Sequence, residues 1–453
     1  MKRQKSKYVC QSCGYQSLRW LGKCPECGEW NSFYEELETR SKSVNAAAKN
    51  ADKPIPVTRI KETDYARFKT GISEFDRVLG GGIVPGSAIL IGGAPGIGKS
   101  TLLLQVCEAL VKNDLTVLYI SGEESLSQIK SRAVRIGIAS ENLLLAAETD
   151  VDVISGFFEE HRPDLVIVDS VQTVFSDQME SLPGNISQVR YSGHTLTSIA
   201  KKTHIPLFLV GHVNKAGNVA GPRVLEHLVD VLILMEGDNN YFRLLRPIKN
   251  RFGSTQEVGI FEMTGKGLRQ VHNPSEYLTA QIETDTPGTV VTASLEGTRA
   301  LLVEVQALVS TTNYGIPQRT VSGIDQRRLA ILLAVMEKHA GMRFGTKDVF
   351  ATIAGGLKIS EPALDLAVIC AIASSSFSKP VHIKTVIGGE VGLTGEIRGI
   401  PNPEARIKEA ERLGYEHIVL PFQNVSGIKK QAYGIDISGV KTLKQVIKKL
   451  FGS

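Results

Sequence analysis

Short apolar runs alternate with segments of helical period from about residue 88 onward, and each run ends in a polar or glycine-rich cluster. The runs that predict strands are 88–91, 117–120, 143–145, 165–168 and 207–210. Apolar strands separated by helices predict a parallel sheet that is buried on both faces. Ligand groups in such a sheet gather at the carboxyl ends of its strands, so the polar clusters mark the expected site.

Two further runs, 231–235 and 241–245, predict an antiparallel extension of this sheet. The stretch that follows the extension is richer in Pro, Ser, Glu and Thr, which predicts a boundary before a second α/β unit. The chain is therefore expected to be an α/β protein in five segments. They are a four-cysteine module (1–34), a flexible linker (35–58), an α/β core with a mostly parallel sheet (59–272), a second linker (273–286) and a C-terminal α/β domain (287–453).

The composition is that of a globular protein of two or three domains, with 453 residues, 42% of them apolar and 22% charged. No apolar run approaches the roughly 18 residues of a membrane span. No apolar stretch follows the basic N-terminus, as it would in a secretory signal. Six cysteines in a chain of this length do not suggest a disulfide scaffold. These features predict a cytoplasmic protein with no membrane partner.

The net charge of +5 is too small to indicate a nucleic-acid partner by itself, but its distribution is uneven. No acidic residue precedes Glu26, whereas six cations do: Lys2, Arg3, Lys5, Lys7, Arg19 and Lys23. This basic arm either contacts phosphates or is a solvated tail, and charge alone favours neither interpretation.

The strongest motif directly follows the run 88–91. It reads Gly93-Ala94-Pro95-Gly96-Ile97-Gly98-Lys99-Ser100, matches G-x-x-x-x-G-K-[ST] at every fixed position, and continues through Thr101 as a helix. The glycines let successive backbone N–H groups turn toward one anion, and the helix N-terminus adds positive potential behind them. Lys99 is expected to reach the β- and γ-phosphates, and the Ser100 hydroxyl is expected to bind Mg²⁺. The stretch predicts a nucleoside-triphosphate site.

Polar residues at three other strand ends are further candidates for this site. Asp169 closes the run 165–168, where a carboxylate is expected to hold Mg²⁺. Glu123 is the candidate that polarises the attacking water, because its strand is expected to lie beside the phosphate loop, and Glu124 is its rival. His212 either senses the γ-phosphate or is simply a polar strand end.

The N-terminal module carries two C-x-x-C pairs, Cys10 with Cys13 and Cys24 with Cys27, and a glycine follows each pair. Four thiolates at this spacing suit tetrahedral Zn²⁺ in a closed structural site, and a disulfide pairing is the weaker alternative. The aromatic residues of the module, Tyr15, Trp20 and Trp30, are expected to pack over it, with stacking on bases as the alternative.

The predicted antiparallel extension is followed by Lys249-Asn250-Arg251-Phe252-Gly253, in which two cations flank an asparagine. This segment is either a solvated hairpin tip or a contact to a phosphate, of nucleotide or of DNA. The order of all these parts resembles the RadA (Sms) family of bacterial DNA-repair and recombination proteins. The resemblance covers the whole chain. It rests on the four cysteines, Thr70-Gly71 with Gly80-Gly81-Gly82, the phosphate loop and the Lys249–Gly253 motif, which separates this family from other RecA-like ATPases.

The resemblance implies a RecA-like core that hydrolyses ATP between the subunits of a homohexameric ring, with Glu123 as the catalytic glutamate. It also implies a DnaB-like motor on single-stranded DNA that drives branch migration of branched recombination intermediates in concert with RecA, in the nucleoid-associated cytoplasm. In such a ring Lys249 and Arg251 are expected to act on the neighbouring subunit's nucleotide, because they follow the distal extension of the sheet. A grip on DNA is the alternative role.

The C-terminal domain resembles the proteolytic domain of Lon protease, with one departure. Lon's nucleophilic serine follows Gly-Pro, but this chain has Glu361-Pro362-Ala363, and Glu404 falls where Lon has its lysine. A Ser–Lys dyad needs a hydroxyl and an amine. We therefore expect a ring-forming scaffold with a DNA-binding surface. Two other functions stay open: a nucleotide-switched mediator that binds DNA and RecA without unwinding, and a protease that uses Ser360 with Lys358.

Overall fold

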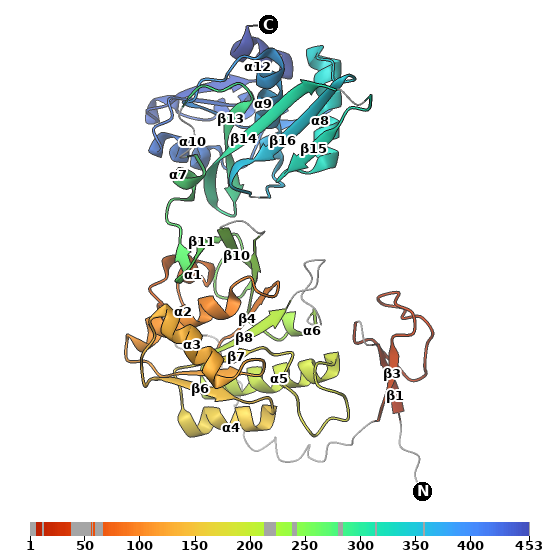
Figure 1. Cartoon of the computed structure of the whole chain (residues 1–453), viewed down its shortest axis with the longest axis vertical. Coiled ribbons are helices and arrows are strands. Elements are labelled where there is room, and N and C mark those ends of the chain that lie inside the picture. The colour runs from red at the N-terminus through yellow and green to blue at the C-terminus, as the bar shows by residue number, and fades with distance from the viewer. Residues whose placement is uncertain are drawn as a thin grey trace. The chain divides into compact units, whose positions relative to one another are not determined.

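The computed structural model describes residues 6–10, 13–37, 56, 58, 67–212, 223–237, 242–279, 284–312, 315–356 and 358–452. The chain divides into two compact units (Figure 1). The first holds residues 1–237, 241–255 and 261–270, and the second holds 238–240, 256–260 and 271–453. Most of the predicted linker 35–58 lies outside the described residues. Within the described part of the chain, every helix is too short or too polar to cross a membrane.

The N-terminal module is a small antiparallel sheet in the order β2-β1-β3. Its strands are β1 (Ser6–Cys10), β2 (Gln16–Ser17) and β3 (Phe33–Leu37). The core of the module is small and consists of Cys10, Cys24 and Phe33. A module with so small a core depends on a bound metal for most of its stability.

The first unit is built on a nine-stranded sheet in the order β12-β11-β10-β9-β4-β8-β7-β5-β6. The strands are β4 (Ala88–Gly93), β5 (Val117–Ser121), β6 (Leu143–Ala147), β7 (Leu165–Asp169), β8 (Leu207–His212), β9 (Val231–Glu236), β10 (Phe242–Asn250), β11 (Gly259–Thr264) and β12 (Gly267–Gln270). Neighbouring strands from β9 through β6 are parallel, which confirms the predicted parallel sheet.

The predicted antiparallel extension is corrected in two respects. First, β9 is parallel to β4 and continues the parallel sheet, and the antiparallel pairing starts between β9 and β10. The sequence cannot distinguish these cases, because an apolar run has the same pattern in either direction. Second, β10 extends to Asn250, so Lys249 and Asn250 lie in a paired strand and not at a solvated hairpin tip.

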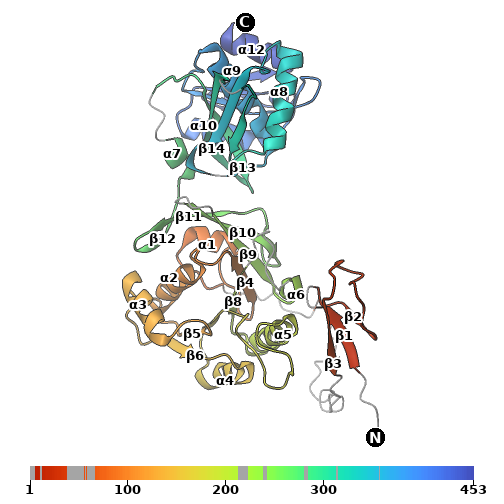
Figure 2. The same cartoon turned by 45° about the vertical axis from the view of Figure 1, so that its right-hand side comes forward.

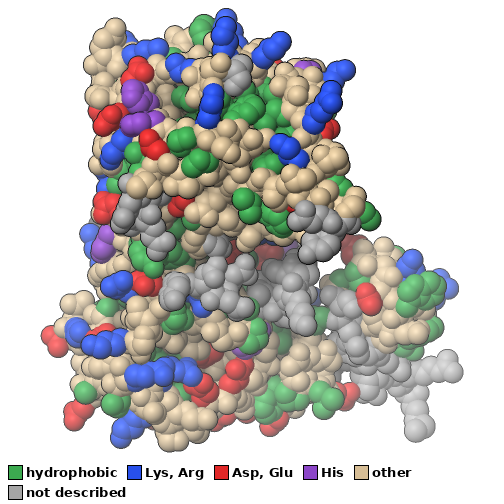
Figure 3. Space-filling view, turned by 45° about the horizontal axis from the view of Figure 1, so that its top comes forward, with side chains coloured by type: hydrophobic (Ala, Val, Ile, Leu, Met, Phe, Trp, Pro, Cys, Tyr) green, Lys and Arg blue, Asp and Glu red, His purple; other side chains and the backbone are tan. Residues whose placement is uncertain are grey.

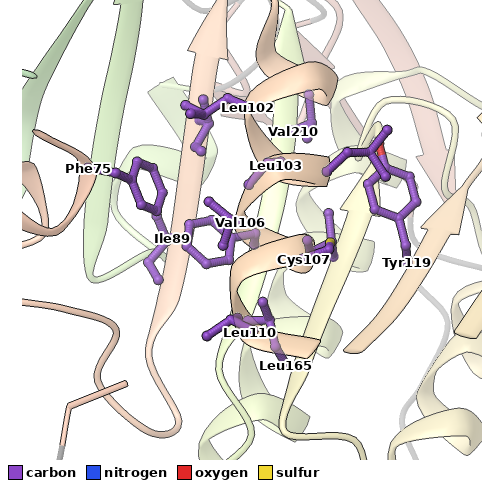
Figure 4. Packing of buried hydrophobic residues seen from close by; sticks show 14 of the residues in the cluster. Phe75, Ile89, Leu102, Leu103, Val106, Cys107, Leu110, Tyr119, Leu165 and Val210 are labelled. Atoms are coloured by element: carbon purple, nitrogen blue, oxygen red, sulfur yellow. The ribbon is translucent and has the colours of Figure 1, made fainter. Parts of the chain in front are cut away.

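Helices cover both faces of this sheet, as Figures 1 and 2 show. They are α1 (Ser73–Val78), α2 (Lys99–Val111), α3 (Leu126–Ile136), α4 (Val151–His161), α5 (Ile186–Thr203) and α6 (Arg223–Glu226). Side chains from α1, α2 and α3 pack in the core on one face, and those from α4, α5 and α6 pack in the core on the other. Figure 4 shows Leu103, Val106 and Leu110 of α2 directed into the first of these cores. Burial on both faces explains why the central strands are apolar throughout.

The second unit is built on a mixed seven-stranded sheet in the order β15-β16-β14-β13-β17-β20-β21. Its strands are β13 (Thr289–Glu296), β14 (Arg299–Thr311), β15 (Arg319–Ser322), β16 (Lys347–Ile353), β17 (Thr385–Ile387), β20 (His417–Pro421) and β21 (Asp436–Val440), with a separate pair β18 (Glu390–Val391) and β19 (Ile397–Arg398). Its helices are α7 (Pro274–Thr279), α8 (Gln326–Ala340), α9 (Asp365–Phe377), α10 (Pro403–Arg412), α11 (Phe422–Val425) and α12 (Leu443–Phe451).

Helix α7 falls inside the segment 273–286 that the sequence predicts to be a linker, and it packs within the second unit. Its Ser275 hydroxyl donates a 2.6 Å hydrogen bond to Glu409 of α10 and accepts one of 3.0 Å from the backbone N–H of Leu302 in β14. Leu278 is buried as well. The short helix has too few apolar residues for its pattern to stand out from a linker.

Candidate nucleotide site and metal centre

The phosphate loop joins the carboxyl end of β4 to the first residue of α2. Gly96 and Gly98 have φ values of 75° and 116°, in the region that favours glycine. Gly98 also lies under the β11–β12 hairpin, because a Cβ there would be 2.7 Å from the Met263 methyl group. Gly96 therefore requires glycine for its backbone conformation, and Gly98 requires it for both conformation and space.

The Lys99 side chain folds back over this loop. Its Nζ donates to the carbonyl oxygens of Gly93 (2.8 Å) and Ala94 (3.0 Å) and lies 3.5 Å from Nδ1 of His212. Burial lowers the pKa of Lys99, and the carboxylates of Asp169 and Glu123 oppose that shift. An ammonium group held here by main-chain carbonyls is placed to exchange them for phosphate oxygens.

Asp169 and Ser100, the two predicted Mg²⁺ ligands, share a neighbour that sequence reasoning missed. The Tyr119 hydroxyl donates a 2.6 Å hydrogen bond to Oδ2 of Asp169, and the Ser100 hydroxyl lies close enough to the same phenol to act on it. Burial, and next the charge of Asp169, raise the pKa of Tyr119, which keeps the phenol protonated as a donor. A hydroxyl and a carboxylate are oxygen ligands of the kind that Mg²⁺ takes in such sites. In the sequence Tyr119 looks like one more apolar strand residue, so no signal singled it out.

Glu123, Ser170 and His212 meet at the carboxyl ends of β5, β7 and β8. One carboxylate oxygen of Glu123 accepts from the Ser170 hydroxyl at 2.5 Å and lies 3.0 Å from Nε2 of His212. Burial would raise the pKa of Glu123, but the hydrogen bonds from Ser170 and His212 outweigh it and lower that pKa. Ser170 is a second member that sequence reasoning missed, since it merely follows the strand end at Asp169.

The expectation that the strand of Glu123 lies beside the phosphate-loop strand is wrong, because β8 and β7 separate β5 from β4. The side chain reaches the site by another route. The backbone N–H of Gly122 donates to the carbonyl of Asp169 (2.9 Å), so the chain bends across the end of β7. A side chain at Gly122 would prevent this, since its Cβ would be 2.1 Å from Oγ1 of Thr173.

Glu124 lies apart from this group. Its carboxylate forms an ion pair of 2.5 Å with Arg132 of α3. Of the two neighbouring glutamates, Glu123 is therefore the one that the structure brings to Lys99 and His212.

Lys249 and Arg251 lie far along the sheet from their own phosphate loop. Lys249 pairs with Leu232 near the amino end of β9, whereas the loop starts beside the carboxyl end of that strand. The Lys249 Nζ donates to the carbonyls of Glu226 and Val229, both at 2.8 Å, and Arg251 forms a 3.1 Å ion pair with Asp230. Burial and then the neighbouring Arg251 lower the pKa of Lys249.

Two motifs of the sequence analysis, the glycine segment 80–82 and the segment 249–253, meet at the end of β10. A Cβ on Gly80 would lie 2.9 Å from Cα of Gly253, so the glycine segment and the Lys249–Gly253 segment touch backbone to backbone. Arg67 donates to the carbonyls of both Gly80 and Phe252 and holds the contact together. Near the other end of β10, Arg243, which sequence reasoning missed, donates to the carbonyl of Ile97 in the phosphate loop at 3.1 Å. Strand β10 therefore contacts the phosphate loop near one end, through Arg243, and carries the start of the Lys249–Gly253 motif at the other.

The four cysteines of the N-terminal module form one cluster, with all sulfur atoms within 4.8 Å of one another. Cys10 and Cys27 are 3.7 Å apart and Cys13 and Cys24 are 3.5 Å apart. Sulfur ligands bound at about 2.3 Å to a tetrahedral zinc ion lie about 3.8 Å from each other, so this cluster fits zinc.

The two knuckles of the module repeat the same backbone bonds. Gly14 donates to Cys10 and Gly28 donates to Cys24, each at 2.9 Å. Trp20 and Trp30 are 52% and 68% exposed, so the expectation that these indoles pack over the module is not met.

Three family models match successive parts of the chain. A rubredoxin metal binding domain matches residues 8–35, an AAA domain matches 54–218, and subunit ChlI of Mg-chelatase matches 303–424. The chain is 47% identical over 458 aligned residues to DNA repair protein RadA of Bacillus subtilis, with both chains covered completely. It is 46% identical over 447 residues to that of Listeria monocytogenes, covering 98% of each chain, and 45% identical over 452 residues to that of Aquifex aeolicus, covering all of each. The chain belongs to the RadA family.

Membership of the RadA family confirms the resemblance drawn from the motifs, together with the order of a zinc-binding module, an ATPase core and a C-terminal α/β domain. The AAA match includes the phosphate loop, Glu123, Asp169 and His212, and it ends before Lys249. The four-cysteine cluster and the rubredoxin-type match together assign a metal site to the module.

In the C-terminal domain of this RadA-family chain, Ala363 and Glu404 stand at the two positions that were compared with Lon's Ser–Lys dyad. Ala363 is buried and its carbonyl accepts from the backbone N–H of Gly389, whereas Glu404 is exposed on α10. Beside them, Glu361 pairs with the fully buried Arg406 and accepts bonds from the Ser294 hydroxyl (2.9 Å) and the Leu295 N–H (2.7 Å). This ion pair is satisfied by its surroundings and serves the packing of the domain.

Proposed function

We propose that this protein is a DNA-dependent ATPase of recombination and repair, a DnaB-like hexameric motor on single-stranded DNA that promotes branch migration with RecA. The observation that carries the proposal is the convergence of Lys99, Glu123 and His212 at the carboxyl ends of three strands, next to Asp169. Phosphoryl transfer needs cations on the phosphates and an oriented water, and this group supplies both kinds of side chain.

In the proposed binding step, the loop N–H groups and the α2 N-terminus receive the phosphates. Lys99 exchanges the carbonyls of Gly93 and Ala94 for phosphate oxygens. Ser100 and Asp169 would hold Mg²⁺, which neutralises charge on the β- and γ-phosphates when it is bound.

In the proposed chemical step, Glu123 orients and polarises the attacking water. Its lowered pKa keeps it an anion at neutral pH, as a hydrogen-bond acceptor for water requires. His212 lies between Lys99 and Glu123 and directly precedes the segment 213–222, which is outside the described residues. We propose that His212 moves from Glu123 to the γ-phosphate and so senses the nucleotide state.

Lys249 and Arg251 are proposed to act in trans, on the nucleotide of the next subunit of the ring. Their position at the opposite end of β10 from the loop supports this role. DNA contacts are assigned to the C-terminal domain, which is proposed to act as the scaffold of the ring. Figure 3 shows many Lys and Arg side chains over the surface of this domain, which suits a phosphate backbone.

The test is strand displacement on a forked DNA substrate with ATP, with and without RecA. Wild type is expected to displace the strand, and Lys99→Ala is expected to lose displacement and at least about 10²-fold in ATP turnover. Lys112→Ala, at the exposed residue directly after the same helix, is the matched control and should keep both activities. ATP turnover without displacement would favour the nucleotide-switched mediator, and ATP-dependent digestion of casein would favour a protease.

A further inference from the structure

The two oxygens of the Glu123 carboxylate differ in their surroundings. Oε1 accepts a hydrogen bond from the Ser170 hydroxyl (2.5 Å) and lies 3.0 Å from Nε2 of His212. Within the part of the chain that the structure describes, Oε2 makes no hydrogen bond. The Glu123 side chain is 41% exposed, so water reaches it. Oε1 is thus the anchored oxygen, and Oε2 is the one that is open to a water molecule.

The anchor on Oε1 is held in place by the backbone around it. Ser170 is fully buried, and its carbonyl accepts from the hydroxyl (2.7 Å) and the backbone N–H (3.2 Å) of Thr173, which closes a turn after β7. The Thr173 side chain also packs against Gly122, since a Cβ on Gly122 would lie 2.1 Å from its Oγ1. Gly122 directly precedes Glu123. One turn therefore positions both the hydroxyl that donates and the backbone that carries the carboxylate.

The second neighbour of Oε1 is less firmly placed. The His212 side chain is 31% exposed, and its other ring nitrogen, Nδ1, lies 3.5 Å from Nζ of Lys99. In the function proposed above, His212 leaves Glu123 for the γ-phosphate. Once it has left, Ser170 is the partner of Oε1 that remains among the described residues.

We propose that Ser170 is a positioning residue for ATP hydrolysis, whose hydroxyl holds Oε1 of Glu123 so that Oε2 faces the attacking water. The inference rests on the proposed role of Glu123. A glutamate that is not anchored samples several rotamers, and only some of them present an oxygen to the water. Anchoring the carboxylate therefore favours the chemical step. ATP binding is left to the phosphate loop and Lys99, which do not contact Ser170 through any hydrogen bond between described residues.

The inference is tested by steady-state ATP turnover of the full chain, with kcat and KM determined separately. Ser170→Ala removes a hydrogen bond to a charged group and should lower kcat by about 10-fold or more, while KM for ATP stays within about 2-fold of wild type. Ser192→Ala is the matched control, because Ser192 is also fully buried in the first unit and its hydroxyl donates to the carbonyl of Val174 (3.2 Å). The control should change neither constant. A wild-type kcat in folded Ser170→Ala would overturn the inference.

Ser170→Cys separates positioning from packing. The thiol fills the space of the hydroxyl but is a weak hydrogen-bond donor, so kcat should stay as low as in Ser170→Ala. If Ser170→Cys instead restores the wild-type kcat, Ser170 only fills space and the inference is wrong.

A double variant separates the inference from the proposed role of Glu123. In a Glu123→Gln background, adding Ser170→Ala should lower the remaining turnover by less than about 2-fold, because the two side chains act as one unit. An effect transmitted through the neighbouring Asp169 would persist in this background, and a further loss of about 10-fold would therefore overturn the inference. Full turnover in Glu123→Gln alone would refute the role of Glu123 itself.

Discussion

The buried Tyr119 hydroxyl is 2.6 Å from Oδ2 of Asp169 and donates a hydrogen bond to it. Tyr119 comes from β5 and Asp169 from the end of β7, and the Ser100 hydroxyl at the start of α2 lies close to the same phenol. Since Asp169 and Ser100 are the proposed Mg²⁺ ligands, we propose that Tyr119 is a positioning residue that holds the Asp169 carboxylate in place before the ion arrives.

Tyr119→Phe is expected to weaken the response to Mg²⁺ without preventing folding. The change removes one hydrogen bond to a carboxylate, worth about 1–3 kcal/mol, and keeps the buried ring. Binding of a fluorescent ATP analogue should then need a several-fold higher Mg²⁺ concentration. Tyr415→Phe, at a partly buried tyrosine that packs on the core of the second unit, is the control. An identical Mg²⁺ dependence in Tyr119→Phe and wild type would show that the phenol only fills space.

Glu123→Gln should abolish most ATP turnover, and Glu124→Gln should not. The amide cannot polarise a water as a carboxylate does, and the loss of such a group costs about 10²–10⁴-fold. Glu124 is engaged with Arg132 outside the cluster, so its variant is a matched control of the same size and charge change. Steady-state ATP turnover at saturating ATP is measured for both variants. If Glu124→Gln is the inactive variant, the assignment is reversed.

The lowered pKa of Glu123 also predicts how stability depends on pH. A carboxyl group with a folded-state pKa below its ordinary 4.5 stabilises the fold while it is ionised, and that contribution is lost as pH falls through the folded-state pKa. The stability difference between wild type and Glu123→Gln should therefore stay constant from neutral pH down to 4.5 and shrink below it. Thermal melts of both proteins across this range measure it. A difference that already changes near neutral pH would contradict the lowered pKa.

Zinc removal should unfold the N-terminal module and leave the ATPase core folded. The module's core is only a few residues, whereas the core on either face of the large sheet has its own apolar cluster. Cys10→Ser or Cys27→Ser should release about one zinc ion per chain, measured by elemental analysis, and basal ATP turnover should persist. Cys107→Ser, at a buried core position outside the cluster, is the control that should keep zinc. Purified wild type without metal, or with disulfides among these four cysteines, would refute the zinc assignment.

Much of the fold followed from the sequence because its signals are local. The phosphate loop, the two cysteine pairs and the apolar runs each lie within about ten consecutive residues. Strand order is not local: nothing in residues 117–124 says that β7 and β8 stand between Glu123 and the phosphate loop. The same limit applies to the direction of β9, which depends on how the chain returns to the sheet.

Site residues were found where a polar side chain interrupts an apolar pattern, and missed where it does not. Asp169 and His212 stand out at the ends of apolar runs, whereas Tyr119 sits inside such a run and its hydroxyl is invisible to a periodicity argument. Arg243 was missed because its partner is the backbone carbonyl of Ile97, and a carbonyl has no sequence signature.

Lys249 offers a direct test of the proposed hexameric ring. Its ammonium is held by the carbonyls of Glu226 and Val229, away from its own loop, so its proposed action on ATP has to be exerted on a neighbour. Lys249→Ala and Lys99→Ala subunits should each be poor ATPases alone, since cations supplied in trans are worth about 10³-fold or more in related phosphoryl transfers. Mixed together they should regain turnover, because some interfaces then pair an intact loop with an intact Lys249.

The control mixture is Lys99→Ala with Glu123→Gln. Both of these defects lie on the loop side of the interface, so every site in a mixed ring keeps one of them and no turnover should return. Turnover is measured by phosphate release, and the formation of mixed rings is checked by co-purification of differently tagged subunits. If Lys249→Ala and Lys99→Ala form mixed rings without regaining activity, Lys249 does not act across the interface. The motif at the end of β10 is then assigned to DNA, and Lys249→Ala should instead lower the affinity for single-stranded DNA and its dependence on salt.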